Sequence, residues 1–213
     1  MKSAMSETRA RAGAALGFTI KSGWASAVVI GGSATLPHLI AARRIRLSDP
    51  AIAESSQPYH AGFGTARSSG PELSQLVRSV ERFGRQSVTQ LIRHYQSEGY
   101  KLRGAGLVVG SLIDPERIAN AHIRIHALEG RLFRLIVEDG ATRAGLACST
   151  WRERDLQTSA AGILKHKERE LRQLLTAVGR DAEGPWRAEE KKATLAAWLI
   201  LAGGRPPRQR TIA

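Results

Sequence analysis

The fold of this chain is decided by the stretch GFTIKSGWASAVVI, residues 17–30. Aromatic and β-branched residues occur in both halves of it, and this composition is typical of β-strands. Ser22-Gly23 separates the two halves, and residues 31–33, Gly-Gly-Ser, follow the second; both are turn signals. A third extended run covers residues 39–47. The stretch therefore predicts an antiparallel meander of three strands joined by two short turns.

The remainder of the chain alternates between helical and extended patterns. Asp114-Pro115 has the composition of a helix start, with a capping carboxylate before a proline at the first helical position. The elements predicted from apolar spacing are a helix over residues 71–98, a strand over 102–109, a helix from Asp114-Pro115 to about residue 140, a strand over 146–151, and helices over 160–178 and 187–202. This order predicts an α/β fold: a mixed sheet, in which parallel strands extend the antiparallel three-strand meander, flanked by helices.

One domain accounts for the folded part of the chain. We expect residues 1–16, which show no clear period, to form a flexible N-terminal leader. The domain itself is predicted over residues 17–202, and residues 203–213 are expected to form a basic flexible tail. Within the domain, the Gly- and Ser-rich residues 57–70 predict a long excursion between the meander and the first helix.

The charge of the chain limits its partners. Among 213 residues, 32 Lys and Arg exceed 19 Asp and Glu, and the resulting net charge of +13 favours nucleic acid as a partner of this basic protein. The single cysteine, Cys148, cannot form an internal disulfide, and we expect it to pack inertly in a strand. The longest apolar stretch, residues 195–202, is too short to span a membrane. We therefore expect a cytoplasmic protein without a membrane partner.

Three stretches resemble the ribonuclease H-like superfamily, and most closely the RuvC-like Holliday junction resolvases. Residues 17–23, continuing through Val28-Val29-Ile30, are similar to the first strand, turn and second strand of that family. Gly106-Leu107-Val108-Val109 resembles the fourth strand, and residues 125–136, with Glu129-Gly130, resemble the helix that crosses the sheet next. The resemblance implies a ribonuclease H-like fold, nucleic acid as the partner and a homodimer as the assembly.

The same resemblance implies a metal-dependent nuclease, and here the sequence departs from the family. The family's nucleases hold two divalent metal ions with carboxylates from the first strand, the fourth strand and the final helix, because two such ions need several anionic oxygen ligands. Thr19 stands in place of the first-strand acid, and Gly110 or Ser111 in place of the fourth-strand acid. Only the final helix offers acids, in the sequence Glu189-Glu190-Lys191-Lys192. We therefore expect no metal cofactor and no cleavage by the family's mechanism.

An alternative chemistry is indicated by His122, His126 and Glu129. Residues three and four apart share one side of a helix, so these side chains converge beside the apolar face. Two imidazoles and a carboxylate can bind a transition metal, or the carboxylate can orient a histidine that acts as acid or base. The competing interpretation is that these boundary residues only form hydrogen bonds with neighbouring loops.

Three further groups are candidates for binding phosphate or nucleic acid. Lys21-Ser22 lies at the first turn and can contact a phosphate, although a plain hairpin turn has the same composition. Tyr59-His60 in the Gly-rich excursion can stack on a base or donate to phosphate, or pack as ordinary loop residues. Arg43, Arg44 and Arg46 on the third strand can form a basic stripe, or a solvated surface.

Three classes of function remain open. The leading hypothesis is a degenerate ribonuclease H-like domain that binds nucleic acid without cutting it. The second is a metal-dependent nuclease or hydrolase whose site has moved to His122, His126 and Glu129. The third is a protein-interaction module whose charge attracts an acidic partner. Salt-dependent binding separates the first class from the third, and metal-dependent cleavage that is lost in H122A identifies the second.

Overall fold

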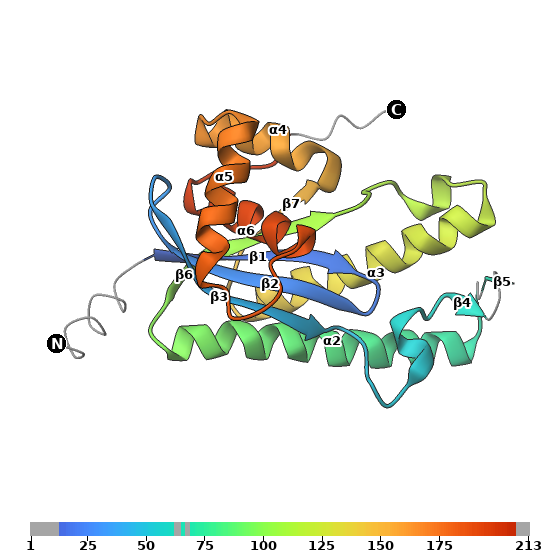
Figure 1. Ribbon diagram of the computed structural model, residues 1–213. Coiled ribbons are helices and arrows are strands. Elements are labelled where there is room, and N and C mark those ends of the chain that lie inside the picture. The colour runs from blue at the N-terminus through green and yellow to red at the C-terminus, as the bar shows by residue number, and fades with distance from the viewer. Residues whose placement is uncertain (1–12, 62–64, 67–68, 208–213) are drawn as a thin grey trace.

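A five-stranded mixed sheet forms the centre of the protein (Figure 1). The computed structural model describes residues 13–61, 65–66 and 69–207. The strands of the sheet are β1 (Gly13–Lys21), β2 (Trp24–Gly32), β3 (Pro37–Arg46), β6 (Lys101–Val109) and β7 (Cys148–Arg152). Their order is β3-β2-β1-β6-β7; β2 pairs antiparallel with both β1 and β3, whereas β1, β6 and β7 pair in parallel. The predicted meander and the mixed α/β sheet are confirmed.

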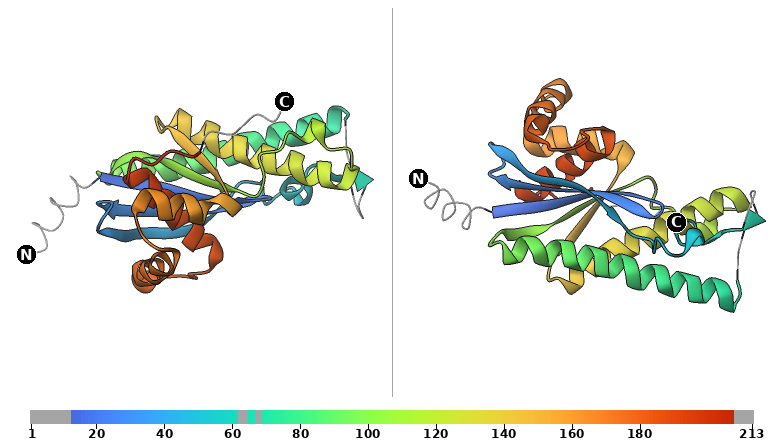
Figure 2. Two further views of the ribbon diagram at one scale, coloured as in Figure 1. Left: turned by 90° about the horizontal axis from the view of Figure 1, so that it is seen from above. Right: turned by 60° about the horizontal axis from the view of Figure 1, so that its bottom comes forward.

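Helices cover both faces of this sheet, as Figure 2 shows. α2 (Pro71–Ser97) and α3 (Ala121–Arg143) lie on one face, and α4 (Glu153–Leu164), α5 (Glu168–Val178) and α6 (Ala188–Leu201) lie on the other. The connections contain the short turns η1 (Ala53–Ser56), η2 (Pro115–Arg117) and η3 (Gly179–Asp181), and a pair of two-residue strands, β4 (His60–Ala61) and β5 (Thr65–Ala66). Within the described ranges, no helix combines the length and the apolar character that a membrane span requires.

β1 is buried on both sides because each face of the sheet has its own apolar core. Leu16, Phe18 and Ile20 belong to the core beneath α2 and α3, whereas Ala15 belongs to the core beneath α6. A strand covered on both faces carries apolar residues at consecutive positions instead of alternate ones. Thr19, with 1% of its surface exposed, is the buried polar residue of this strand, and Lys21 at its end is half-buried.

α6 lies close to β1 and β6 because each strand has a glycine beneath it. A Cβ atom on Gly17 would lie 1.8 Å from the backbone oxygen of Ala193, and one on Gly106 would lie 2.5 Å from that of Ala196. Any larger residue would push the helix away from the sheet. This close approach brings the first turn of α6 against β1, where Thr19 lies.

The first strand begins earlier than predicted. β1 starts at Gly13, so residues 13–16 belong to the sheet and not to a flexible leader. Three of these four residues are fully buried, since small and apolar side chains fit between the two helical layers. The other residues of the expected leader and tail, 1–12 and 208–213, lie outside the described residues, and residues 203–207 follow α6 without regular structure.

Two helices also differ from the prediction. Asp114 begins only the short turn η2, and α3 starts later, at Ala121, because the side chain of Asn120 caps its first turn. The helix predicted over residues 160–178 is two helices. Lys165 ends α4 in a left-handed conformation, with a φ angle of 57°, and the chain changes direction there before α5 begins.

Candidate functional site

Two hydroxyl groups fasten the start of α6 to the sheet. Thr19 Oγ1 donates a hydrogen bond to the backbone oxygen of Glu189 at 2.8 Å, and Ser26 Oγ donates to Glu190 Oε1 at 3.0 Å. Thr19 and Ser26 face each other across β1 and β2, and both are buried. Glu190 Oε2 also accepts from the N–H of Arg187 at 2.9 Å, which caps α6. The polar groups where β1 meets α6 are therefore engaged with one another.

Two other carboxylates at this end of the sheet, those of Glu153 and Glu189, are paired with lysines. Lys21 Nζ lies 3.8 Å from Glu153 Oε2 and 4.0 Å from Glu189 Oε1. Lys192 Nζ donates to Glu153 Oε1 from the side of α6. The hydrogen bond from Lys192 holds the pKa of Glu153 below its usual value. The charges of Lys192 and Lys21 also lower this pKa, whereas burial raises it.

This set of donors does not fit a centre of two divalent metal ions. After β6, Gly110 has no side chain, and Ser111 Oγ accepts a hydrogen bond from the N–H of Ile113 at 3.1 Å. Thr19 offers only a neutral hydroxyl that already donates to a backbone oxygen. The carboxylate of Glu153 is next to ammonium groups, whose positive charge would repel a divalent cation. Among the described residues, those around Thr19 thus lack the uncommitted anionic oxygens that two ions require.

Basic side chains lie beside the same end of the sheet. The strand register places Lys21 opposite Trp24 and Trp24 opposite Arg46, and the adjacent row places Ser26 opposite Arg44. Because side chains alternate along a strand, these residues share the face on which α6 packs. The Arg44 guanidinium stacks on the Trp24 ring, 3.6 Å from its centre. We call Lys21, Arg44 and Arg46 the basic end of the sheet.

The basic stripe predicted on β3 is divided between the two faces. Arg43 points to the face covered by α2, where its guanidinium lies 5.8 Å from the ring centre of Tyr95. Arg44 and Arg46 are exposed on the opposite face. A ligand that approaches from the side of α6 therefore meets two of the three arginines and not the third.

A second cluster surrounds the buried carboxylate of Glu129 on α3. Glu129 Oε1 lies 2.7 Å from Nδ1 of His60 on β4, and Glu129 Oε2 accepts a hydrogen bond from Ser22 Oγ at 3.3 Å. The ring centre of His126 is 5.1 Å from that of His60. His60, His126 and Glu129 each offer one ligand atom, and these three atoms lie within 4.8 Å of one another. The arrangement joins α3, the β1–β2 turn and the connection before α2.

Helical spacing predicts His122 as the third member of this cluster, whereas the structure brings in His60. His122 Nε2 lies 3.2 Å from His126 Nε2, on the exposed part of α3. His60 is separated from Glu129 by 69 positions, so no local pattern connects the two residues. The only sequence signal for His60 is its place in the excursion rich in glycine and serine.

Tyr59, the neighbour of His60, packs partly against the core beneath α2 and α3. Burial is the largest cause that raises the pKa of its hydroxyl, and the charge of Glu81 adds to the effect. Part of the ring is therefore used in packing, as the ordinary interpretation of a loop aromatic predicts.

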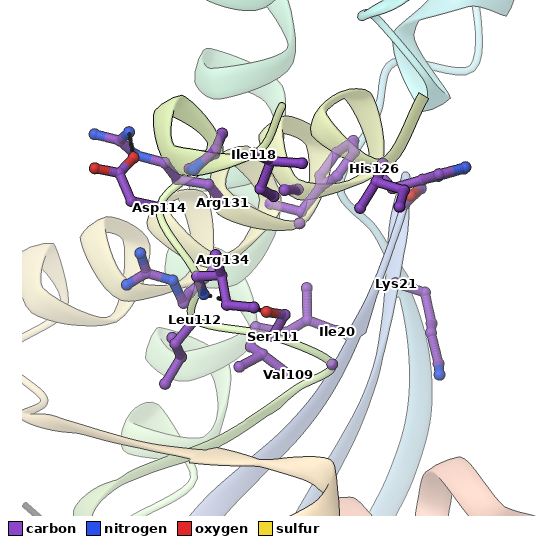
Figure 3. Close-up of a pocket in the computed structure, with 18 residues that line it drawn as sticks. Ile20, Lys21, Val109, Ser111, Leu112, Asp114, Ile118, His126, Arg131 and Arg134 are labelled. Atoms are coloured by element: carbon purple, nitrogen blue, oxygen red, sulfur yellow. Dashed lines mark hydrogen bonds and ion pairs between the residues drawn. The ribbon is translucent and has the colours of Figure 1, made fainter. Parts of the chain in front are cut away.

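A cavity of about 590 Å³ lies at the carboxyl ends of β1 and β6, as shown in Figure 3. Its apolar lining includes Ile20, Val109 and Phe133, and its polar lining includes Lys21, His126 and Arg131. Arg131 lies 3.5 Å from the carboxylate of Asp114 at one end of the cavity. The carboxyl ends of parallel strands are where sheets of this kind bind ligands.

Solved structures share this fold. The Thermus thermophilus RuvC structure matches with a TM-score of 0.51 and 11% sequence identity, and the match covers 87% of this chain and 91% of that chain. T. thermophilus RuvC in complex with Holliday junction substrate matches with a TM-score of 0.51 and 10% identity over 87% of this chain and 90% of that chain. No protein-family model and no curated protein sequence matches this chain. The similarity confirms the predicted resemblance to RuvC-like, ribonuclease H-like proteins at the level of the fold.

Proposed function

We propose that this protein binds nucleic acid through the basic end of the sheet and does not cleave it. The observation that carries the proposal is that hydroxyl and cationic side chains lie where β1 ends. Thr19 and Ser26 hold the start of α6 there, and Lys21, Arg44 and Arg46 occupy the same and the adjacent rows of the sheet. The hydroxyl of Thr19 therefore stands where the resemblance implies a first-strand carboxylate, and three cations lie in the same and the adjacent rows.

Phosphate groups are the ligands that this arrangement suits. Arginine binds phosphate through two parallel N–H donors, and Arg44 is held in place by its contact with Trp24. The net charge of +13 attracts a polyanion before contact is made. RuvC in complex with Holliday junction substrate has the same fold, so a four-way DNA junction is the first ligand to test.

The same residues support the part of the proposal that excludes cleavage. Metal-assisted hydrolysis of a phosphodiester needs ions that polarise the phosphate and stabilise the leaving oxygen. Glu153 and Glu189 are paired with lysines, and Glu190 accepts from Ser26 and caps α6. A phosphate at the basic end would therefore be bound by ammonium and guanidinium groups that do not activate a water molecule.

The test is a comparison of two double variants with equal loss of charge. R44A/R46A removes two cations from the basic end, and R78A/R82A removes two exposed arginines from α2, on the opposite face. Binding of a labelled four-way junction, a duplex and a single strand is measured by fluorescence anisotropy at several salt concentrations. We expect R44A/R46A to weaken binding at least tenfold at low salt and to reduce the slope of log K against log salt by about 2, roughly one for each phosphate that is no longer neutralised.

We expect the α2 variant to weaken binding by less than about threefold, because a distant cation contributes only through long-range attraction. Equal effects of the two variants would show that the basic end is not the interface. Cleavage of the junction in Mg²⁺ or Mn²⁺ would refute a binding protein that does not cut. Failure to bind any nucleic acid at low salt would instead favour a protein-interaction module.

A further inference from the structure

We infer that His60, His126 and Glu129 form a binding site for one divalent transition-metal ion. The three residues come from β4 and α3, and their ligand atoms lie within 4.8 Å of one another. The site shares no residue with the basic end of the sheet, although Lys21 and His126 line the same cavity, and its test does not depend on nucleic-acid binding. Its ligands, two imidazoles and one carboxylate, are typical of zinc and of the neighbouring metals cobalt and nickel.

The buried carboxylate of Glu129 is the strongest reason to expect a metal ion at this site. Its side chain is only 1% exposed, and a buried carboxylate is costly unless a cation or several hydrogen bonds compensate its charge. Among the described residues, its hydrogen-bond partners are the Ser22 hydroxyl and the ring of His60, and no lysine or arginine forms an ion pair with it. A divalent ion would compensate this charge at the same place.

The distances are those of a site that closes when the ion enters. Zinc bonds to nitrogen and oxygen are about 2.0–2.2 Å long, so the donors of a tetrahedral site lie about 3.3–3.5 Å apart. Glu129 and His60 are already closer than this, at 2.7 Å, because they share a hydrogen bond that the ion would replace. His126 is exposed, so its ring can move inward and the ion can reach the buried carboxylate from that side.

His122 acts as a positioning residue in this site. Its Nε2 lies 3.2 Å from Nε2 of His126, and the two rings meet edge to face with their centres 4.7 Å apart. A hydrogen bond to the ring of a metal ligand orients that ring and tunes its basicity. Three protein ligands leave the fourth position of a tetrahedral ion open to water, beside the cavity that His126 also lines.

The experiment uses the full chain, freed of metal with a chelator that is then removed. Co²⁺ is titrated while the visible absorption of tetrahedral cobalt is recorded, Zn²⁺ is used as the competitor, and bound metal is counted after dialysis. We expect one ion per chain. H60A, H126A and E129Q should each weaken the affinity at least tenfold, and H122A should weaken it less than they do.

The matched control is H94A. His94 lies 3.7 Å from Glu98 on α2, an exposed histidine–glutamate pair that has no third ligand among the described residues. Its loss should leave the cobalt spectrum and the stoichiometry unchanged. Circular dichroism establishes that each variant is folded, and H126A decides the result if E129Q does not fold, because His126 is exposed and outside the core.

Two outcomes would overturn the inference: a wild-type chain that takes up no Co²⁺ or Zn²⁺ at micromolar concentration, and uptake that persists unchanged in H60A and H126A. Neither outcome affects the proposal on nucleic acid, since anisotropy in the presence of chelator measures that binding independently. If the ion binds, it should also raise the melting temperature of the wild type and not that of H126A, because a ligand that binds only the folded chain stabilises it.

Discussion

Oε1 of Glu129 and Nδ1 of His60 lie 2.7 Å apart, although 69 positions separate the two residues in the sequence. Glu129 is on a helix that packs against the sheet, and His60 is in the connection that leads from β3 to α2. Ser22 joins the same carboxylate from the β1–β2 turn. The buried side chain of Glu129 therefore connects α3, the β1–β2 turn and the connection before α2.

Replacing His60 by alanine should destabilise the fold. The variant leaves the carboxylate of Glu129 buried, with the Ser22 hydroxyl as its remaining hydrogen-bond partner among the described residues. Leaving a buried polar group without its partner costs about 1–3 kcal/mol. We expect H60A to lower the free energy of unfolding by this amount in urea denaturation with chelator present. E129Q should cost less than H60A, because a neutral amide can still bond with Ser22 and leaves no buried charge.

The control for this measurement is again H94A, in which an exposed pair is removed. Surface pairs of this kind contribute about 0.5 kcal/mol or less. A loss of stability in H60A no greater than that in H94A would mean that the contact between His60 and Glu129 does not anchor the connection.

The sheet and its topology can be predicted because each signal is local. Residues 17–30 carry strand composition on both sides of a turn, and β1 and β2 form there. α6 spans Ala188–Leu201 where apolar spacing predicts residues 187–202. The start of β1 is missed because Gly13 and the alanines after it have weak strand preference. Their burial depends on helices that lie far along the sequence.

Apolar spacing predicts only part of the buried face of α3: Ile125 and Leu132 are buried as it predicts, and other positions differ. Its sequence is apolar on more than one side, and spacing favours Leu128 and Leu135 as core positions. Leu135 is instead 44% exposed, and Glu129 is buried. A periodic pattern predicts that a carboxylate is exposed. The burial of Glu129 is compensated by hydrogen bonds with His60 and Ser22, which come from distant parts of the sequence. The candidate site depends on this one long-range contact.

Gly17 should tolerate no side chain, because α6 rests on it. In G17A the new methyl group would lie 1.8 Å from the Ala193 oxygen, which belongs to a helical backbone and cannot rotate away. Overpacking of this kind costs about 1–3 kcal/mol and more when backbone must move. We expect G17A to lower the free energy of unfolding by at least about 3 kcal/mol, or to fail to fold.

Gly162 offers the matched control in α4. A Cβ atom there meets nothing within 4 Å, and alanine is a better helix former than glycine. G162A should therefore raise the stability by up to about 1 kcal/mol. Similar stability of G17A and the wild type would mean that α6 does not approach β1 as closely as the structure has it.

Cys148 should react slowly with alkylating reagents while the chain is folded. Burial raises the pKa of its thiol to about 12, and the charge of Glu138 acts in the same direction. The thiolate is the reactive form, so at pH 8 its fraction should fall on the order of a thousandfold on folding. Because this is the single cysteine, the rate of iodoacetamide labelling in buffer and in guanidinium reports on one site. Rates within tenfold of each other would contradict the burial of the thiol.

Because of the ion pairs of Glu153, the free energy of unfolding should decrease as the pH falls into the acid range. The hydrogen bond from Lys192 is the largest cause that lowers the pKa of this carboxyl in the folded chain below its ordinary value of 4.5. A carboxyl whose pKa is depressed by folding stabilises the folded state at pH values above its unfolded pKa. That contribution is lost as the pH falls through the folded pKa, because the proton then binds in both states.

Replacing Glu153 by glutamine should therefore matter at neutral pH and not in strong acid. The side chain is 39% exposed and its partners are partly in water, so solvent screening limits the loss in E153Q to about 1 kcal/mol or less at pH 7. Urea denaturation from pH 7 to pH 3 should show the wild type and E153Q converging below pH 4.5. E183Q, which changes an exposed carboxylate in the loop before α6, should follow the wild type throughout. A gap between the wild type and E153Q that stays constant down to pH 3 would mean that a change in packing, and not the pairing with Lys192 and Lys21, causes the difference.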